Sequence, residues 1–213
     1  KKRIMPKFSL LVIYLFIFCV SLHSQSEDEK ITVIGDSLVG KVVDGESVRE
    51  VVGNVKLSQG NVFVTCNKAI QYLARNEAEL IGNVIATQDS LTLKTEKGYY
   101  FGNLKKTKST SGIILDDTQV VLSADSGEYF FDEARAFFQT NVKLIDSTTT
   151  LMSVELTYLK NLDKSIAIGN VNINDTDNII TADTLTHFRE AKYSIADGHV
   201  SIKNLRDNLT IFG

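Results

Sequence analysis

A short motif recurs along this chain at a constant interval of 29 residues. Gly-Asn-Val occurs at 53–55, again at 82–84 and again at 169–171. Related triplets occupy the other positions of the same grid: Ser111-Gly112-Ile113, Thr140-Asn141-Val142 and Gly198-His199-Val200. A fixed period of this length is typical of supersecondary units that stack and share one core. The chain is therefore predicted to be an array of such units, preceded by a half unit before Gly53.

Three columns of the array are apolar in every complete unit. They are Val55, Val84, Ile113, Val142 and Val171; Leu57, Ala86, Leu115, Leu144 and Ile173; and Val64, Leu93, Leu122, Leu151 and Ile180. Apolar positions two residues apart, rich in Val and Ile, indicate half-buried strands rather than helices. Small polar residues such as those at 59–61 and 146–148 favour turns between them. Each unit is therefore predicted to hold two strands of about ten residues.

Two further columns describe the end of each unit. One holds small residues, such as Cys66 and Ala124, and the other holds Tyr100, Tyr129 and Tyr158. Gln71 and His187 occupy the tyrosine column in the first and last complete units. The small column and the tyrosine column are five residues apart, so a regular strand would place them on opposite faces of the sheet. We therefore predict a bulge or bend between them.

The first residues have the pattern of an export signal. Four basic residues, at positions 1, 2, 3 and 7, flank or precede an apolar run at 8–22, which is followed by Ser24-Gln25-Ser26. This order is typical of a secretory signal, and the run is shorter than the ~20 residues that a membrane span needs. We predict a cleaved signal peptide at 1–26 and one repeat domain at 27–213. A retained membrane anchor is the alternative. Because position 1 is not Met and 212–213 stop part-way through a repeat, we expect a fragment of a longer reading frame.

Charge and cysteine content exclude several classes of function. Residues 1–26 hold four of the 23 Lys and Arg and none of the 26 Asp and Glu, so the remainder carries a net charge of about −7. A nucleic-acid partner would require a basic stripe, and none is visible. Without residues 1–26, Cys66 is the only cysteine, so no intrachain disulfide is predicted.

No group of residues predicts catalysis, a metal site or a cofactor. His187 and His199 occupy the tyrosine and Asn columns of the repeat, and neither has Cys or Glu at metal-ligand spacing. Asp175 and Asp177 lack the distal bidentate Glu of a calcium loop. No nucleophile elbow accompanies the many Ser and Thr residues. Cys66 is predicted to be an inert buried thiol. We therefore expect a protein that is not an enzyme.

The combination of these features resembles the OstA-like family. The resemblance rests on three features: the Gly-Asn-Val triplets, the Leu/Ile-x-Ala-Asp pattern at 122–125 and 180–183, and the spaced tyrosines. It covers residues 31–213. The family comprises periplasmic lipopolysaccharide-transport proteins of the LptA and LptC types and the N-terminal domain of the LptD type.

This resemblance implies an open, V-shaped β jelly roll of two antiparallel sheets, with an apolar groove for the acyl chains of lipid A. The residues expected to line that groove are Val55, Leu57, Val64, Val84, Leu93, Ile113, Leu115, Leu122, Val142, Leu144, Leu151, Val171, Ile173 and Ile180. From the pattern alone, a closed core is the preferred interpretation of the same residues. Thr140 and Ser111-Gly112 depart from the family motif, and Thr149 and Asn178 place polar groups in an otherwise apolar column.

Two functional hypotheses follow. The resemblance implies a periplasmic module, with or without association with the outer membrane, that binds and transports lipopolysaccharide. It also implies joining to other lipopolysaccharide-transport proteins, or head-to-tail self-association, through edge strands such as the one predicted at 31–34. The alternative is a structural β-solenoid of a secreted or surface protein that carries no lipid.

Overall fold

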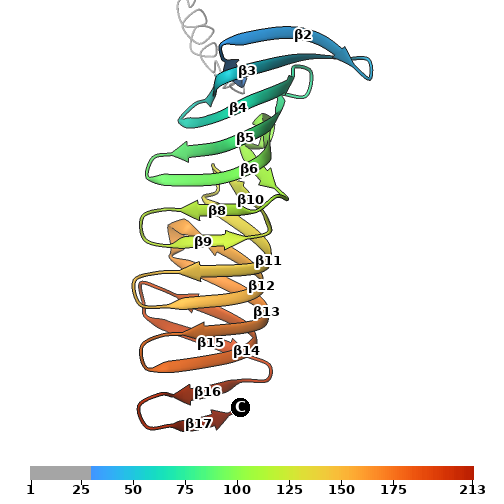
Figure 1. Cartoon of the computed structure of the whole chain (residues 1–213). Coiled ribbons are helices and arrows are strands. Elements are labelled where there is room, and N and C mark those ends of the chain that lie inside the picture. The colour runs from blue at the N-terminus through green and yellow to red at the C-terminus, as the bar shows by residue number, and fades with distance from the viewer. Residues whose placement is uncertain (1–29) are drawn as a thin grey trace, which may run out of the picture.

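The computed structural model describes residues 30–213, which form a tall stack of β-strands (Figure 1). The signal peptide predicted at 1–26 lies outside the described residues. The first strands are Thr32–Ile34 (β1), Ser37–Val43 (β2), Glu46–Gln59 (β3), Val62–Tyr72 (β4), Glu77–Gln88 (β5), Leu91–Phe101 (β6), Lys106–Ser109 (β7), Ile113–Asp116 (β8) and Val121–Ala124 (β9). They continue as Ser126–Phe130 (β10), Arg135–Ile145 (β11), Thr150–Leu159 (β12), Lys164–Asn174 (β13), Asn178–Phe188 (β14), Tyr193–Asp197 (β15), Ser201–Asn204 (β16) and Leu209–Phe212 (β17). Two short 3-10 turns, Gly102–Leu104 (η1) and Lys160–Leu162 (η2), lie between strands.

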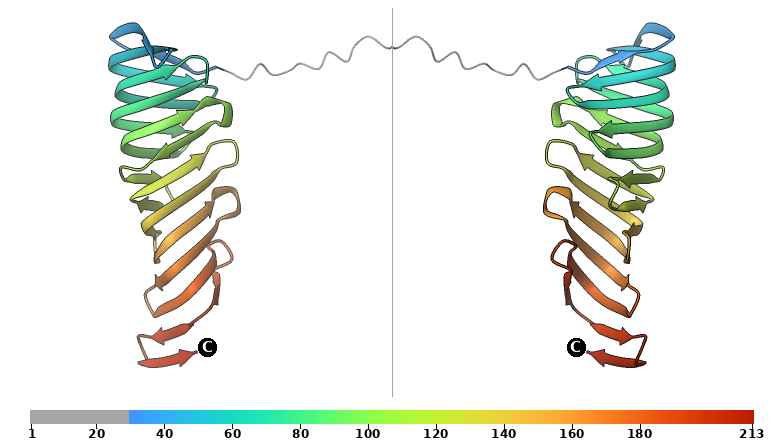
Figure 2. Two further views of the ribbon diagram at one scale, coloured as in Figure 1. Left: turned by 90° about the vertical axis from the view of Figure 1, so that its right-hand side faces the viewer. Right: turned by 90° about the vertical axis from the view of Figure 1, so that its left-hand side faces the viewer.

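The strand pairs are antiparallel and join strands that are consecutive or close together in the sequence. The long strands β3 to β6 pair consecutively, and so do β11 to β14. The side views show β2 near one end and the C-terminus at the other (Figure 2). The predicted all-β architecture of two-strand repeats is therefore confirmed. Within residues 30–213, no helix has the length and apolarity that crossing a membrane requires.

The Gly-Asn motif bends the strands that contain it. In β3 the pairing register with β4 shifts between Val52 and Val55, and Gly53 and Asn54 both have positive φ, 80° and 45°. Consecutive left-handed residues form a bulge, and Gly and Asn are the residues that tolerate this conformation best. The same register shift recurs in β5, β11 and β13. Opposite these bulges the register of β4 is irregular between Cys66 and Lys68, which is where the bend between the small and tyrosine columns was predicted. We call this line of bends the corner.

The corner divides one continuous sheet into two facing halves, which are the two sheets that the family resemblance implies. The tyrosine half consists of 37–43, 46–52, 68–72, 77–81, 97–101, 106–109, 126–130, 135–139, 155–159, 164–168, 184–188 and 193–197. The valine half consists of 32–34, 55–59, 62–66, 84–88, 91–95, 113–116, 121–124, 142–145, 150–153, 171–174, 178–182, 201–204 and 209–212. The edge opposite the corner, where the turns of both halves lie, we call the mouth.

The middle unit departs from the expected pair of long strands. It consists of four short strands, β7 to β10, and its first break lies at Ser111-Gly112. There the Ser109 and Ser111 hydroxyls donate to the Lys97 carbonyl at 2.7 and 3.0 Å. Ser109 Oγ also accepts from the Ser111 amide at 3.2 Å. These local side-chain bonds compete with the β-ladder and interrupt it.

Side-chain pairs reinforce the corner in several units. Asn54 donates to Asp36 at 2.8 Å, and Asn141 donates to Asp125 at 2.7 Å. In the last unit His199 takes the place of Asn, and its Nδ1 lies 2.7 Å from Asp183 Oδ2. The repeat therefore preserves a donor–carboxylate pair even where the donor changes from amide to imidazole.

Replacing Thr140 with Gly is expected to stabilise the protein. Thr140 stands where other units have Gly and has a φ of 64°, which costs a β-branched residue about 1–2 kcal/mol. The greater freedom of Gly in the unfolded chain offsets about 0.4–1 kcal/mol of that gain. We expect Thr140→Gly to raise the free energy of unfolding by roughly 0.5–1 kcal/mol, measured by urea denaturation.

The reverse change at the matched position is the control. Gly169 has a φ of 80°, and a Cβ there would meet the Val154 side chain at 3.1 Å. We expect Gly169→Thr to destabilise the protein by about 1–3 kcal/mol. A loss of stability in Thr140→Gly would contradict this account of the corner.

The His199–Asp183 pair is expected to make the corner of the last unit pH-dependent. The hydrogen bond to Asp183, together with its negative charge, raises the pKa of the exposed His199 imidazole. Because the folded pKa is the higher one, the pair's stabilising contribution is complete below the unfolded pKa and is lost as pH rises through the folded pKa. NMR titration of His199 should show a pKa above 6.5, its ordinary value. In Asp183→Asn that elevation should disappear; a His199 pKa at or below its ordinary value in the native chain would refute the pairing.

Candidate functional site

The structure brings the 14 expected groove residues together between the two sheet halves. Thirteen belong to one buried apolar cluster, and Ile180 packs against it half-buried. Each of the thirteen is at most 6% exposed. In this structure their side chains pack against protein, so the interior is filled along most of its length. Their contact with a lipid stays a prediction.

Tyrosine hydroxyls bridge the mouth. Tyr100, in the tyrosine half, donates to Gln59 Oε1 of the valine half at 2.8 Å, and Tyr158 donates to Asp117 Oδ2 at 2.6 Å. In both pairs the partners are 41 residues apart. In the first unit Gln71 occupies the tyrosine column and donates to the Ile31 carbonyl at 3.1 Å. Hydrogen bonds of the tyrosine column therefore close the mouth in three units.

Burial favours the neutral, protonated form of the three tyrosines. It raises the pKa of Tyr100, Tyr129 and Tyr158, so their hydroxyls keep the protons that they donate. Asp117 is buried, but its Oδ1 accepts from the Gln119 and Val120 amides at 3.0 and 2.8 Å. Both of its oxygens are hydrogen-bonded, which is the condition for burying a carboxylate at acceptable cost.

An aromatic side chain fills the mouth beside the tyrosines. Phe131 is 2% exposed, and its ring centroid lies 6.2 Å from that of Tyr100 and 5.0 Å from that of Tyr129. The contact with Tyr129 is edge-to-face, a favourable arrangement of two rings. Phe131 thus excludes water from the mouth in the middle of the stack.

Toward the C-terminal end the mouth widens into a cleft of about 820 Å³. The turns at 146–149 and 175–178 form its wall on the valine half, and residues 187, 189 and 192–194 form its wall on the tyrosine half. Two of the expected groove residues, Ile173 and Ile180, also line it. We call this the C-terminal cleft. It gives solvent access to apolar residues of the interior, and its rim is polar.

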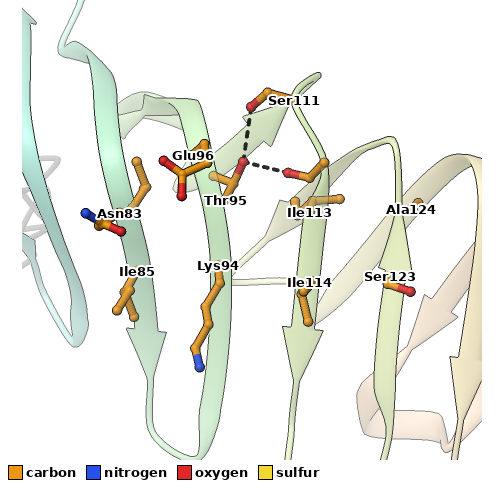
Figure 3. Close-up of a pocket in the computed structure, with 12 residues that line it drawn as sticks. Asn83, Ile85, Lys94, Thr95, Glu96, Ser111, Ile113, Ile114, Ser123 and Ala124 are labelled. Carbon is orange, nitrogen blue, oxygen red and sulfur yellow. Dashed lines mark hydrogen bonds between the residues drawn. The ribbon is translucent and has the colours of Figure 1, made fainter.

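A second cavity, of about 420 Å³, lies at the corner beside the interrupted middle unit (Figure 3). Thr95 is at its centre and bonds to Ser111 at 3.3 Å and to the Gly112 carbonyl at 2.6 Å. Ile85 and Ile114 also line it. Because the hydroxyls bond to one another and to the backbone, this cavity offers less unused chemistry than the C-terminal cleft.

Other residues singled out in the sequence have local partners. Cys66 is buried, its thiol donates to the Lys68 carbonyl at 3.2 Å, and burial raises its pKa. His187 Nδ1 lies 2.9 Å from the Ser194 hydroxyl, and burial lowers its pKa. Among residues 30–213 no cluster of His, Cys, Asp and Glu could hold a metal ion.

Sequence analysis missed the partners that bridge the mouth. Gln59 and Asp117 appear in the sequence only as turn residues. A second spacing could have identified them: in both pairs the turn residue lies 41 residues before its partner in the tyrosine column. That spacing differs from the 29-residue period, so comparing units column by column does not reveal it.

Comparisons with known proteins agree with the sequence resemblance. The family model described as OstA-like protein matches residues 29–183. Among curated proteins, no sequence matches the chain. One solved structure that matches is LptH from Pseudomonas aeruginosa, described as the LptA homologous periplasmic component of the conserved lipopolysaccharide transport device. It is 12% identical, covers 80% of this chain and 84% of its own, and superposes with a TM-score of 0.26.

Removing the hydroxyl of Tyr158 is expected to destabilise the protein. Tyr158→Phe leaves Asp117 Oδ2 without the donor that the structure gives it at 2.6 Å. An unsatisfied buried acceptor costs about 1–3 kcal/mol. Urea denaturation should show that loss, whereas Tyr99→Phe, on a more exposed tyrosine, should change the free energy of unfolding by less than about 0.5 kcal/mol. Equal effects of the two changes would contradict a bridge across the mouth.

Proposed function

The chain belongs to the OstA-like protein family, and from that premise we propose that it is a periplasmic module that binds and transports lipopolysaccharide. The acyl chains of lipid A lie between the two sheet halves and move toward outer-membrane assembly. The observation that carries this proposal is the apolar interior, which runs through successive repeats and meets solvent at the C-terminal cleft. Binding requires no catalytic group.

The energetics support acyl chains as the cargo. Each methylene removed from water contributes about 0.8 kcal/mol. Holding the mouth closed depends on individual hydrogen bonds, each with a net contribution of about 0.5–1.5 kcal/mol. Parting the halves around an acyl chain breaks a few such bonds and the apolar contacts between the halves, and the acyl methylenes then cover the same apolar side chains. The bulged corner is the line about which the halves separate in this proposal.

The edge strands support the proposed partners. All seven residues of β2 are exposed, and within residues 30–213 its one partner strand is β3. At the other end β17 is exposed, and in the same part of the chain it pairs only with β16. Unpaired edges of this kind accept a further strand. We propose that the chain joins related transport proteins, or a second copy head to tail, in this way. We also propose that residues 1–26 direct export and are removed.

A structural solenoid without cargo is the second candidate. The packing of the interior favours it, because thirteen expected groove residues are buried against protein. On this hypothesis the C-terminal cleft has no role in binding, and the protein does not bind lipid.

A charge on the floor of the C-terminal cleft should separate these candidates. Ile180 is half-buried and lines the cleft. The carboxylate of Ile180→Asp would therefore stay in contact with water, and we expect the repeat to remain folded. We expect this change to weaken lipid A binding by more than about tenfold, because the carboxylate would have to be desolvated by an acyl chain. Binding is measured by displacement of a fluorescent lipid A analogue.

The control lies one residue away. Ile179 is in the same strand and points to the opposite face of the sheet. Ile179→Asp should retain wild-type affinity, and circular dichroism should show that both variants are folded. A native chain that fails to bind lipid A would favour the solenoid.

A further inference from the structure

The last position of the tyrosine column differs from the three tyrosines before it. Tyr100, Tyr129 and Tyr158 are 29 residues apart, and the next position is His187. The Tyr158 hydroxyl reaches Asp117 across the mouth. The residue equivalent to Asp117 in the following unit is Asp146, which lies 41 residues before His187. The repeat therefore preserves the acceptor of the bridge and replaces its donor.

His187 does not bridge the mouth. Its Nδ1 bonds to Ser194, on the neighbouring strand of its own sheet half, at 2.9 Å. Asp146 Oδ1 instead accepts from the amides of Thr148 and Thr149 at 2.8 and 2.7 Å. His187 and Asp146 both line the C-terminal cleft, on opposite walls. The cleft thus occupies the place where a tyrosine bridge would lie.

The aromatic filling of the mouth is also replaced here. Arg189 stands two repeats after Phe131 in the same column. It pairs with Asp163 through Nη2, and its buried Nε has no hydrogen-bond partner among residues 30–213. Lys192 lines the cleft beside it. In place of the Phe131 ring, this unit has a guanidinium group and an ammonium group in the lining of the cleft.

The acidic residues of the opposite wall are already engaged. Asp175 Oδ1 accepts from the Asp177 and Asn178 amides at 2.7 Å. Asp177 pairs with Arg206 at 2.6 Å. Arg189 and Lys192 are the basic side chains of the cleft, and a guanidinium group that pairs with a carboxylate through one nitrogen keeps further N–H donors for a phosphate.

We propose that the C-terminal cleft is the port through which acyl chains pass between solvent and the interior, and that Arg189 and Lys192 hold the phosphate-bearing head of the amphiphile at its rim. This proposal rests on the proposed lipid-binding function and adds a location to it. Ile173 and Ile180 lead the acyl chain inward from the cleft. The bridged mouth of the earlier units blocks entry along the rest of the stack.

Restoring the missing bridge should close the port. His187→Tyr places a phenol opposite Asp146, as Tyr158 is placed opposite Asp117. In the full chain, we expect uptake of lipid A labelled with a fluorophore on an acyl chain to slow by at least about tenfold, because a charge-assisted hydrogen bond must break first. His199→Tyr makes the same chemical change at an exposed corner position and should leave the rate unchanged.

The opposite change should open a second port. Tyr158→His removes the bridge to Asp117, and uptake should become faster than in the native chain. If circular dichroism shows that His187→Tyr is misfolded, Tyr158→His alone tests the proposal. An unchanged rate of lipid A uptake in Tyr158→His would then overturn the port. A native chain that takes up no lipid A refutes the proposed function itself. Uptake by the native chain with an unchanged rate in folded His187→Tyr refutes only the port.

The head-group part of the proposal has its own test. Arg189→Gln should reduce affinity for lipid A by about tenfold and leave affinity for its dephosphorylated form nearly unchanged, because the lost interaction is charge-assisted. Comparing the two ligands on one variant cancels any effect of the broken pair with Asp163. Equal losses for both ligands would show that Arg189 does not bind the phosphate.

Discussion

The structure depends on a backbone constraint: two consecutive residues in the left-handed region, repeated every second strand. Gly53 and Asn54 adopt it, and so do Gly82 and Asn83 and Gly169 and Asn170. Each pair forms a bulge in its strand. Because the bulges occupy equivalent positions in successive repeats, they bend the single sheet along one line and bring its two halves face to face. Without these bends the apolar columns would face water on one side of a flat sheet.

Folding the sheet creates an interior with two unlike edges. At the corner the chain is covalently continuous in every strand, so the halves stay together there whatever the interior contains. At the mouth they are held by side chains, and these differ between units. Tyr100 and Tyr158 bridge it, Phe131 fills it, and His187 and Arg189 leave a cleft. Access to the interior is thus determined unit by unit on a constant backbone.

The interior also explains why a core and a binding site are hard to distinguish in this fold. Val55 and Leu122 are buried against protein as core residues are, yet the halves they join are linked at the mouth by a few hydrogen bonds. Residues that close a core in the absence of a ligand suit an acyl chain equally well, because burial of apolar surface is non-directional. Ile180, at the cleft, is the member of this set that remains half-buried.

The sequence by itself determined the repeat, the strands and the bend. Its 29-residue period and the alternation of Val and Ile are local signals, and so are Gly and Asn at positions that require positive φ. Interruption of the middle unit could be anticipated at Ser111-Gly112, although its four short strands depend on hydroxyl contacts with Lys97 that sequence does not show. Only the tertiary structure decided which residues meet across the mouth. Tyr158 and Asp117 lie on opposite halves of the folded sheet, 41 residues apart, and their contact exists only once the corner has brought the halves face to face.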